Sequence, residues 1–160
     1  MSEPAPQSEF HAYQANMFDV EDIVAAAIRF HGESDNAGIV HYNEDKYRSL
    51  VTAYICNQYV ASFVARDKSD QLIGYIHIYC QDDWTEEMIG EMFQFYVAPE
   101  WRGRGVAREL VGLADQKWKE WGCKRVYAEA ASGVNPQLFC NLYNKFGFKQ
   151  AGLVMMKEYE

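Results

Sequence analysis

The stretch Val97-Ala98-Pro99-Glu100-Trp101-Arg102-Gly103-Arg104-Gly105-Val106-Ala107 decides how this chain is organised. It predicts the end of a strand, a tight turn with two glycines and the first turn of a helix. Gly103 and Gly105 let the backbone approach a bulky group, because neither residue carries a Cβ. The helix that follows directs unpaired N–H groups and the positive end of its dipole towards that space. The turn is therefore predicted to bind an anion, and phosphate or pyrophosphate is the usual occupant of such a turn.

The segments on both sides of this turn form a strand–helix–strand unit. Apolar residues recur at helical spacing over 106–121, and Gly122 is the expected end of that helix. A strand is expected over 88–97, ended by Pro99 because proline cannot donate to a ladder, and another over 125–130. A helix that connects two neighbouring strands in this way makes them parallel.

The remaining segments complete one mixed fold. Strands are expected over 11–16, 62–66 and 72–80, helices over 19–32, 43–59 and 136–146, and one or two closing strands over 148–160. We therefore predict an α/β (α+β) fold with a mixed, twisted sheet of six to seven strands flanked by about four helices. Residues 1–9 are expected to form a loose N-terminus, and residues 10–160 a single domain.

Composition excludes several classes of protein. Apolar residues make up 49% and aromatic residues 15% of the 160 residues, which excludes a disordered or fibrous chain. A net charge of −8 argues against nucleic acid as a partner. No apolar run is long enough to span a bilayer, and no signal peptide or paired-cysteine metal motif is recognisable. These features predict a cytoplasmic protein with no membrane partner and no metal.

The turn resembles one found in a known enzyme family. Arg102, Gly105 and Ala107 fill the fixed positions of the motif Q/R-x-x-G-x-G/A of the GCN5-related N-acetyltransferases, the GNAT family. In that family the main-chain amides of the turn bind the pyrophosphate of acetyl-CoA, and the order of the predicted elements also matches the family fold. The resemblance implies acetyl-CoA as acetyl donor. We expect these residues to bind it: Phe95, Tyr96, Val97, Arg102, Gly103, Arg104, Gly105, Val106, Ala107, Arg108 and Asn135.

A second block near the C-terminus strengthens the resemblance. Residues 135–148, N-P-Q-L-F-C-N-L-Y-N-K-F-G-F, are similar to the family block N-x-x-A-x-x-L-Y-x-x-x-G-F. The resemblance implies that Tyr143 lies beside the coenzyme sulfur and protonates the leaving thiolate, which suits a phenol that stays protonated at neutral pH. Asn135 departs from the pattern by one residue, since Pro136 occupies the usual asparagine position, so Asn135 is also a candidate helix cap.

Acetylation of an amine needs a group that accepts a proton. Glu91 is the first candidate for this base. Strand alternation predicts that it shares a face with Phe93, Phe95 and Val97, where desolvation would raise the pKa of its carboxyl. Glu129 on the later strand, His77 and water are the alternatives, although a histidine on an apolar strand is more often a hydrogen-bonded core residue.

The predicted function is transfer of an acetyl group from acetyl-CoA to a primary amine by direct attack in a ternary complex. A small molecule or a peptide carries that amine, and the motifs do not say which. Acidic or titratable side chains in three segments are candidates to line its pocket: Glu33, Asp35, His41, Asp82 and Asp83. The alternative is a non-catalytic module that binds acyl-CoA or a protein partner on the same fold, and a homodimer is left open.

Overall fold

A computed structural model describes residues 9–152 and 154–157. The predicted loose terminus thus lies outside the described residues, apart from Glu9. The chain order is β1 (Phe10–Gln14), α1 (Val20–Glu33), α2 (Glu44–Ile55), β2 (Val60–Asp67), β3 (Leu72–Asp82), β4 (Met88–Val97), α3 (Val106–Glu120), β5 (Arg125–Tyr127) and α4 (Pro136–Asn144), with short 3-10 turns at Met17–Asp19 and Pro99–Trp101.

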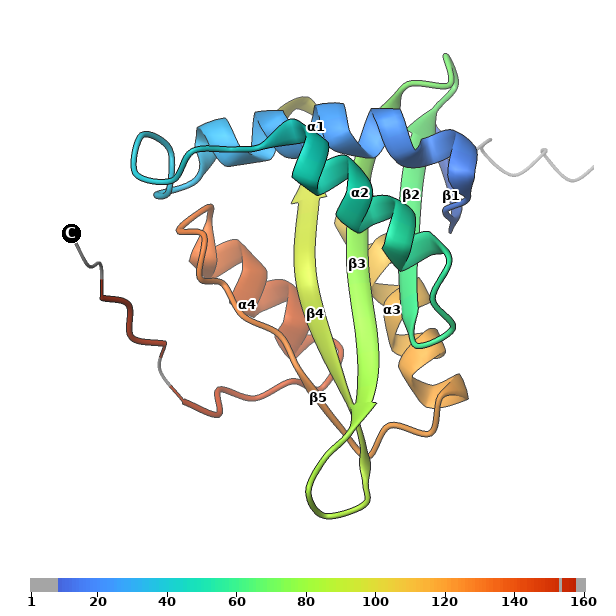
Figure 1. Cartoon of the computed structure of the whole chain (residues 1–160), viewed down its shortest axis with the longest axis vertical. Coiled ribbons are helices and arrows are strands. Elements are labelled where there is room, and N and C mark those ends of the chain that lie inside the picture. Colours follow the sequence, from blue (N-terminus) through green and yellow to red (C-terminus); the bar gives the residue numbers. More distant parts are fainter. Residues whose placement is uncertain (1–8, 153, 158–160) are drawn as a thin grey trace, which may run out of the picture.

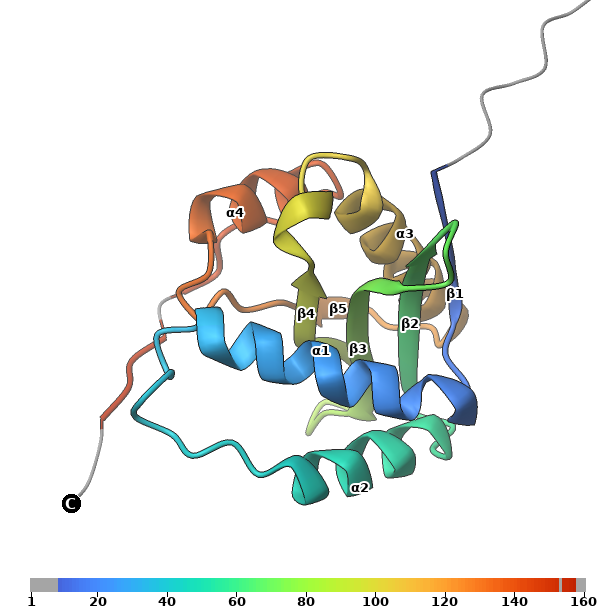
Figure 2. The same ribbon diagram turned by 90° about the horizontal axis from the view of Figure 1, so that it is seen from above.

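One sheet with the order β1-β2-β3-β4-β5 runs through the molecule. Neighbouring strands are antiparallel except β4 and β5, which are parallel and are joined by α3. Helices α1 and α2 cover one face, and α3 and α4 lie on the other (Figures 1 and 2). The predicted mixed α/β fold and the predicted parallel strand pair are therefore confirmed. No helix in the described parts of the chain is long and apolar enough to cross a membrane.

The strand count of six to seven was too high, because the described residues form five strands. Strand β5 ends at Tyr127 rather than near residue 130, since β4 has no residue paired with it beyond Glu91. The closing strands expected over 148–160 are not formed within 148–152 or 154–157. Three apolar side chains of this segment are exposed: Val154, Met155 and Met156. The short β5 thus has β4 as its one strand partner among the described residues.

A bulge changes the alternation along β4. Gln94 pairs with His77 and Met92 pairs with Ile78, so Phe93 is an extra residue on β4. A bulge of this kind shifts the facing of all residues on one side of it by one position.

The bulge corrects the face predicted for Glu91. Phe95 and Val97 belong to the apolar cluster on the α3 and α4 side of the sheet. Glu91 instead pairs with Tyr79 on β3. Tyr79 shares a face of β3 with His77, two residues earlier, and His77 contacts Tyr47 of α2. Glu91 therefore faces the α2 side of the sheet, and its carboxylate does not share a face with Phe95 or Val97.

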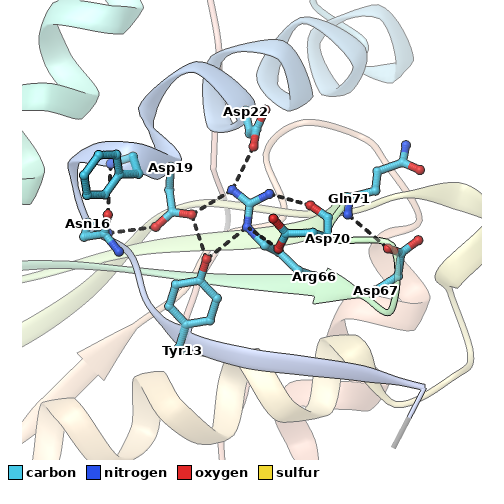
Figure 3. A network of polar contacts seen from close by, with 9 residues as sticks. Tyr13, Asn16, Asp19, Asp22, Arg66, Asp67, Asp70 and Gln71 are labelled. Carbon is cyan, nitrogen blue, oxygen red and sulfur yellow. Dashed lines mark hydrogen bonds and ion pairs between the residues drawn. The ribbon is translucent and has the colours of Figure 1, made fainter.

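A closed polar network ties β1, α1 and β2 together (Figure 3). The buried Arg66 guanidinium donates to Asp19 at 2.8 Å, to Asp22 at 2.7 Å, to the Tyr13 hydroxyl at 2.9 Å and to the Asp70 carbonyl at 2.7 Å. Breaking a buried ion pair of this kind is strongly destabilising, because the remaining charge loses its partner. The network therefore anchors α1 to the edge of the sheet.

Candidate active site

The turn before α3 is open on its ligand side. Gly103 and Gly105 have φ of 79° and 91°, in the left-handed region that favours glycine. A Cβ added at either residue would meet no atom within 4 Å. Gly105 is the N-cap of α3, and no side chain caps this helix. The first N–H groups of α3 therefore have no side-chain acceptor, and the turn has the geometry of an anion site.

The parallel strands β4 and β5 separate next to this turn. Their pairing runs from Ile89 with Arg125 to Glu91 with Tyr127, whereas β4 continues to Val97. On the β5 side, the backbone of residues 92–97 thus has no strand partner among the described residues. Such N–H and C=O groups need hydrogen-bond partners, which an amide-containing ligand can supply.

A cavity of about 650 Å³ joins the turn, the open edge of β4, the segment 129–135 and α4. Most of the predicted coenzyme-binding residues line it: Phe95, Tyr96, Val97, Arg102, Gly103, Gly105, Ala107, Arg108 and Asn135. Two do not. Val106 is fully buried, and the Arg104 guanidinium lies 5.2 Å from the centre of the Trp101 ring and 3.8 Å from the Glu9 carboxylate. The side chain of Arg104 thus points away from the cavity.

Arg102 holds the turn against its neighbours. Its Nε donates to the Val97 carbonyl at 3.0 Å, and its terminal nitrogen donates to Glu33 Oε2 at 2.6 Å. Both bonds tie the turn to the end of β4 and to the end of α1. Arg102 is therefore already paired within the fold, whereas Arg108 on the first turn of α3 is exposed.

Asn135 stands at the N-cap position of α4 but does not cap it with its side chain. Its φ is 46°, and no side-chain capping hydrogen bond is present. Pro136 occupies the first helical position, as predicted from its missing N–H. Asn135 lines the cavity instead.

Tyr143 lies just behind the cavity wall. Its ring stacks on Phe139 with 4.3 Å between ring centres and meets the edges of Phe148 and Phe95 at 4.9 and 6.4 Å. The hydroxyl is buried and has no hydrogen-bond partner in the described structure. Burial raises the pKa of Tyr143, so the phenol is protonated at neutral pH. A buried donor without a partner is costly for a protein.

The three candidate bases have different surroundings. Glu129 lines the cavity. Glu91 does not line it, and its carboxylate accepts hydrogen bonds from the Tyr79 hydroxyl and, at 3.2 Å, from Gln81. His77 is fully buried among aromatic side chains, and burial lowers its pKa to about 3. His77 is thus a hydrogen-bonded core residue and lies outside the cavity.

The acidic residues predicted to surround the acceptor do not line the cavity. Asp83 pairs with Arg125 at 2.5 Å near the hairpin of β3 and β4, at the opposite end of β4 from the turn (Figure 1). Glu33 pairs with Arg102. Aromatic and aliphatic side chains that the sequence did not single out form much of the wall: Phe30, Met92, Phe93, Leu138, Phe139 and Leu142. Leu138 on α4 is 61% exposed, so the fold leaves this apolar side chain uncovered at the cavity, which the sequence alone does not reveal.

The sequence model described as "Acetyltransferase (GNAT) family" matches residues 30–148. The chain therefore belongs to the GNAT family of acetyltransferases, as its motifs indicated, and acetyl-CoA is the acetyl donor. The residues present fit this donor, since the uncapped turn offers N–H groups to phosphates and the open edge of β4 offers backbone groups to amides. No curated protein matches the chain by sequence.

Solved structures share the fold. The aminoglycoside acetyltransferase AAC(6')-Iy, bound to a CoA bisubstrate analogue, has a TM-score of 0.75 at 17% identity, with 96% of this chain and 99% of that chain covered. AAC(6')-Ih from Acinetobacter baumannii has 0.72 at 15%, covering 94% and 98%. The ribosomal-protein-alanine N-acetyltransferase from Brucella melitensis biovar Abortus 2308 has 0.69 at 15%, covering 93% and 99%. At 15–17% identity, these three similarities show that the fold is shared.

Proposed function

We propose that the protein acetylates a primary amine by direct attack on acetyl-CoA in a ternary complex. The observation that carries the proposal is one cavity that joins the uncapped turn, the open edge of β4 and residue Glu129. Acetyl-CoA needs an anion site for its phosphates and backbone groups that pair with its amides, and the attacking amine needs a proton acceptor. One cavity offers all three.

The backbone of Gly103–Arg108 would hold the pyrophosphate, because its N–H groups and the positive end of the α3 dipole face the cavity. The backbone of Phe95–Val97 would hold the amide-containing pantetheine arm at the edge that β5 leaves open. The exposed Arg108 would add a charge-assisted bond to a phosphate. When bound, acetyl-CoA supplies an activated acetyl group.

Glu129 is the base that the cavity favours. Glu129 is one of the residues that line the cavity, whereas Glu91 is not, and the Glu91 carboxylate accepts hydrogen bonds from Tyr79 and Gln81. Glu91 would act through an intervening water. Glu129 would take the proton of the amine as nitrogen attacks the acetyl carbon.

Tyr143 is the proposed acid. Its hydroxyl is protonated and has no partner within the fold described, and its ring packs on Phe139 and Phe95 of the cavity wall. It would donate its proton to the leaving sulfur.

The acceptor is proposed to be an amine on a small molecule or a peptide. The similar structures include enzymes named for aminoglycosides and for a ribosomal-protein alanine, and both kinds of acceptor are amines. The cytoplasmic location and a homodimer stay predictions.

Release of the free thiol of coenzyme A from acetyl-CoA, across a panel of amines, tests the function. We expect turnover with at least one primary amine and mass-spectrometric detection of its acetylated product. Binding of acetyl-CoA is measured separately by calorimetry. Binding without turnover of any amine would contradict the proposal and would favour the non-catalytic acyl-CoA-binding module.

A further inference from the structure

A chain of four hydrogen-bonded side chains crosses the sheet from β2 to β4. Ser62 Oγ lies 2.6 Å from His77 Nδ1, and His77 Nε2 lies 3.2 Å from the Tyr47 hydroxyl. The Tyr47 hydroxyl donates to Gln94 Oε1. Ser62, His77 and Tyr47 are buried, and Gln94 lines the cavity.

The direction of every bond in this chain follows from its last member. An amide oxygen can only accept, so the single proton of the Tyr47 hydroxyl points to Gln94. The oxygen of Tyr47 must then accept a proton from His77 Nε2. His77 is neutral, because full burial lowers its pKa to about 3, and a neutral imidazole carries one N–H. His77 Nδ1 therefore accepts from the hydroxyl of Ser62.

The fixed direction determines which end of the Gln94 amide is available. Its oxygen is occupied by Tyr47, and its nitrogen forms no hydrogen bond with any described residue. The amide nitrogen is also not among the fully buried polar atoms that lack a partner. The NH₂ group of Gln94 therefore has no partner among the described residues, and Gln94 is one of the residues that line the cavity.

Gln94 is placed for the acceptor rather than for the phosphates. It follows the bulged Phe93 and faces the α2 side of β4, whereas Phe95 and Val97 face the side of α3 and α4. Ser62, His77, Tyr47 and Gln94 are all neutral, so the amide N–H of Gln94 suits a neutral oxygen as its acceptor. A donor aimed at the attacking nitrogen would occupy the lone pair that the reaction needs.

We infer that Gln94 determines acceptor specificity by donating a hydrogen bond to a hydroxyl, ether or carbonyl oxygen of the amine substrate. Tyr47, His77 and Ser62 are positioning residues that hold the amide in this orientation. The inference rests on the proposed function. It narrows the acceptor to amines that also carry such an oxygen, as amino sugars, amino alcohols and amino-acid amides do, and it disfavours simple alkyl polyamines.

Matched pairs of amines test this specificity. Phenylalaninamide is compared with 2-phenylethylamine, and glucosamine with cyclohexylamine, each with wild type, Gln94→Leu and Tyr47→Phe. Each kcat/KM is expressed per neutral amine, because the oxygen-bearing member of each pair is the weaker base. We expect wild type to prefer the oxygen-bearing member by roughly three- to tenfold in kcat/KM, the effect of one neutral hydrogen bond. Gln94→Leu should abolish the preference and Tyr47→Phe should reduce it.

Tyr54→Phe is the matched control. Tyr54 packs against His77 and Phe93 but donates no hydrogen bond to Ser62, His77, Tyr47 or Gln94. The control should keep the preference of wild type. Full preference in Gln94→Leu would overturn the inference. Turnover without preference in wild type contradicts this inference alone, whereas absence of turnover with any amine contradicts the proposed function as well.

Nitrogen NMR of the His77 ring gives a readout that does not depend on turnover. In the protein alone at neutral pH, we expect a neutral ring with its proton on Nε2. Tyr47→Phe should change the Nε2 shift, because the acceptor of that proton is removed. A proton on Nδ1, or a charged ring, would overturn the positioning chain.

Discussion

Two polar regions of this molecule use their hydrogen-bonding groups in opposite ways. Around Arg66, guanidinium nitrogens, carboxylates and a phenol satisfy one another inside the fold (Figure 3). In the turn before α3, two glycines remove the Cβ atoms and no side chain caps the helix. The closed region stabilises the fold, whereas the open region keeps its donors for a ligand.

The electrostatics of the closed region agree with this contrast. Burial alone would raise the pKa of Asp19, but the Asn16 N–H, Arg66 and Tyr13 together hold it below its usual value. A group with a lowered pKa stabilises the folded state in its charged form. The charges of Arg66 and Asp19 therefore compensate each other within the protein, whereas the N-terminus of α3 has no side-chain cap and stays open to an anion.

The largest effect is expected from Glu129, the proposed base, which lines the same cavity as the open region. Glu129→Gln removes the proton acceptor but keeps the shape of the side chain, and we expect kcat/KM to fall by about 100-fold or more. Steady-state thiol release measures it. Glu91→Gln is the matched control, because Glu91 lies outside the cavity, and its effect should be much smaller. The reverse ranking would make Glu91 the base.

The next largest effect is expected on stability, from a substitution in the closed region. Asp19→Ala should lower the free energy of unfolding by about 3 kcal/mol, since it leaves the buried Arg66 without its most buried partner. Urea denaturation measures it. Asp22→Ala should have a smaller effect, because the Asp22 side chain is 53% exposed. Affinity for acetyl-CoA should not change in either variant. A loss of affinity would show that the two regions are not separate.

Acid should weaken the closed region in a defined direction. Because the folded pKa of Asp19 is lowered, its stabilisation is complete above the unfolded carboxyl pKa of about 3.9 and is lost as the pH falls through the folded value. The stability difference between wild type and Asp19→Asn should therefore be largest near neutral pH and should shrink in acid. A difference that grows in acid would contradict the lowered pKa.

A smaller effect, on the affinity for acetyl-CoA, is expected from a substitution in the glycine turn. Gly105→Ala puts a side chain at φ of 91°, which strains the turn by roughly 1–2 kcal/mol, and should weaken acetyl-CoA binding by about tenfold. Calorimetry measures the affinity. Gly122→Ala at the other end of α3 is the matched control, since its φ is 74° and its space is equally open. The control should lose stability but keep affinity. Equal affinity in both variants would remove the turn from the binding site.

The smallest effect separates two arginines that the sequence treats alike. Arg108→Ala should weaken acetyl-CoA binding by about three- to tenfold, because Arg108 is exposed and is one of the residues that line the cavity. Arg104→Ala should leave the affinity unchanged, since Arg104 packs over Trp101 and faces Glu9. The same calorimetric titration compares them. A larger loss with Arg104→Ala would reverse the assignment.

Local signals in the sequence predicted the frame of the site. Glycine at positive φ, proline at the first turn of α4 and the apolar stripe of α3 each act within a few residues. The strand–helix–strand order then required the parallel pair of β4 and β5. These features are readable because neighbouring residues determine them.

Features that depend on distant partners were missed. No residue near Phe93 indicates a bulge, yet the pairing of β4 with β3 inserts one and turns Glu91 to the α2 side. The direction of Arg104 depends on Trp101 and Glu9. The apolar residues after Gly147 suggested strands, but a strand also needs a partner edge, and β5 is three residues long.

We expect the open N–H groups of the turn to hold the acetyl donor while the Arg66 network serves the fold. Amide NMR during titration with acetyl-CoA separates these two roles. We expect the largest shift changes at the amides of Gly103–Arg108 and Phe95–Val97, and little change at Tyr13, Asp19 and Arg66. Saturable binding that leaves the amides of the turn unshifted would contradict the claim.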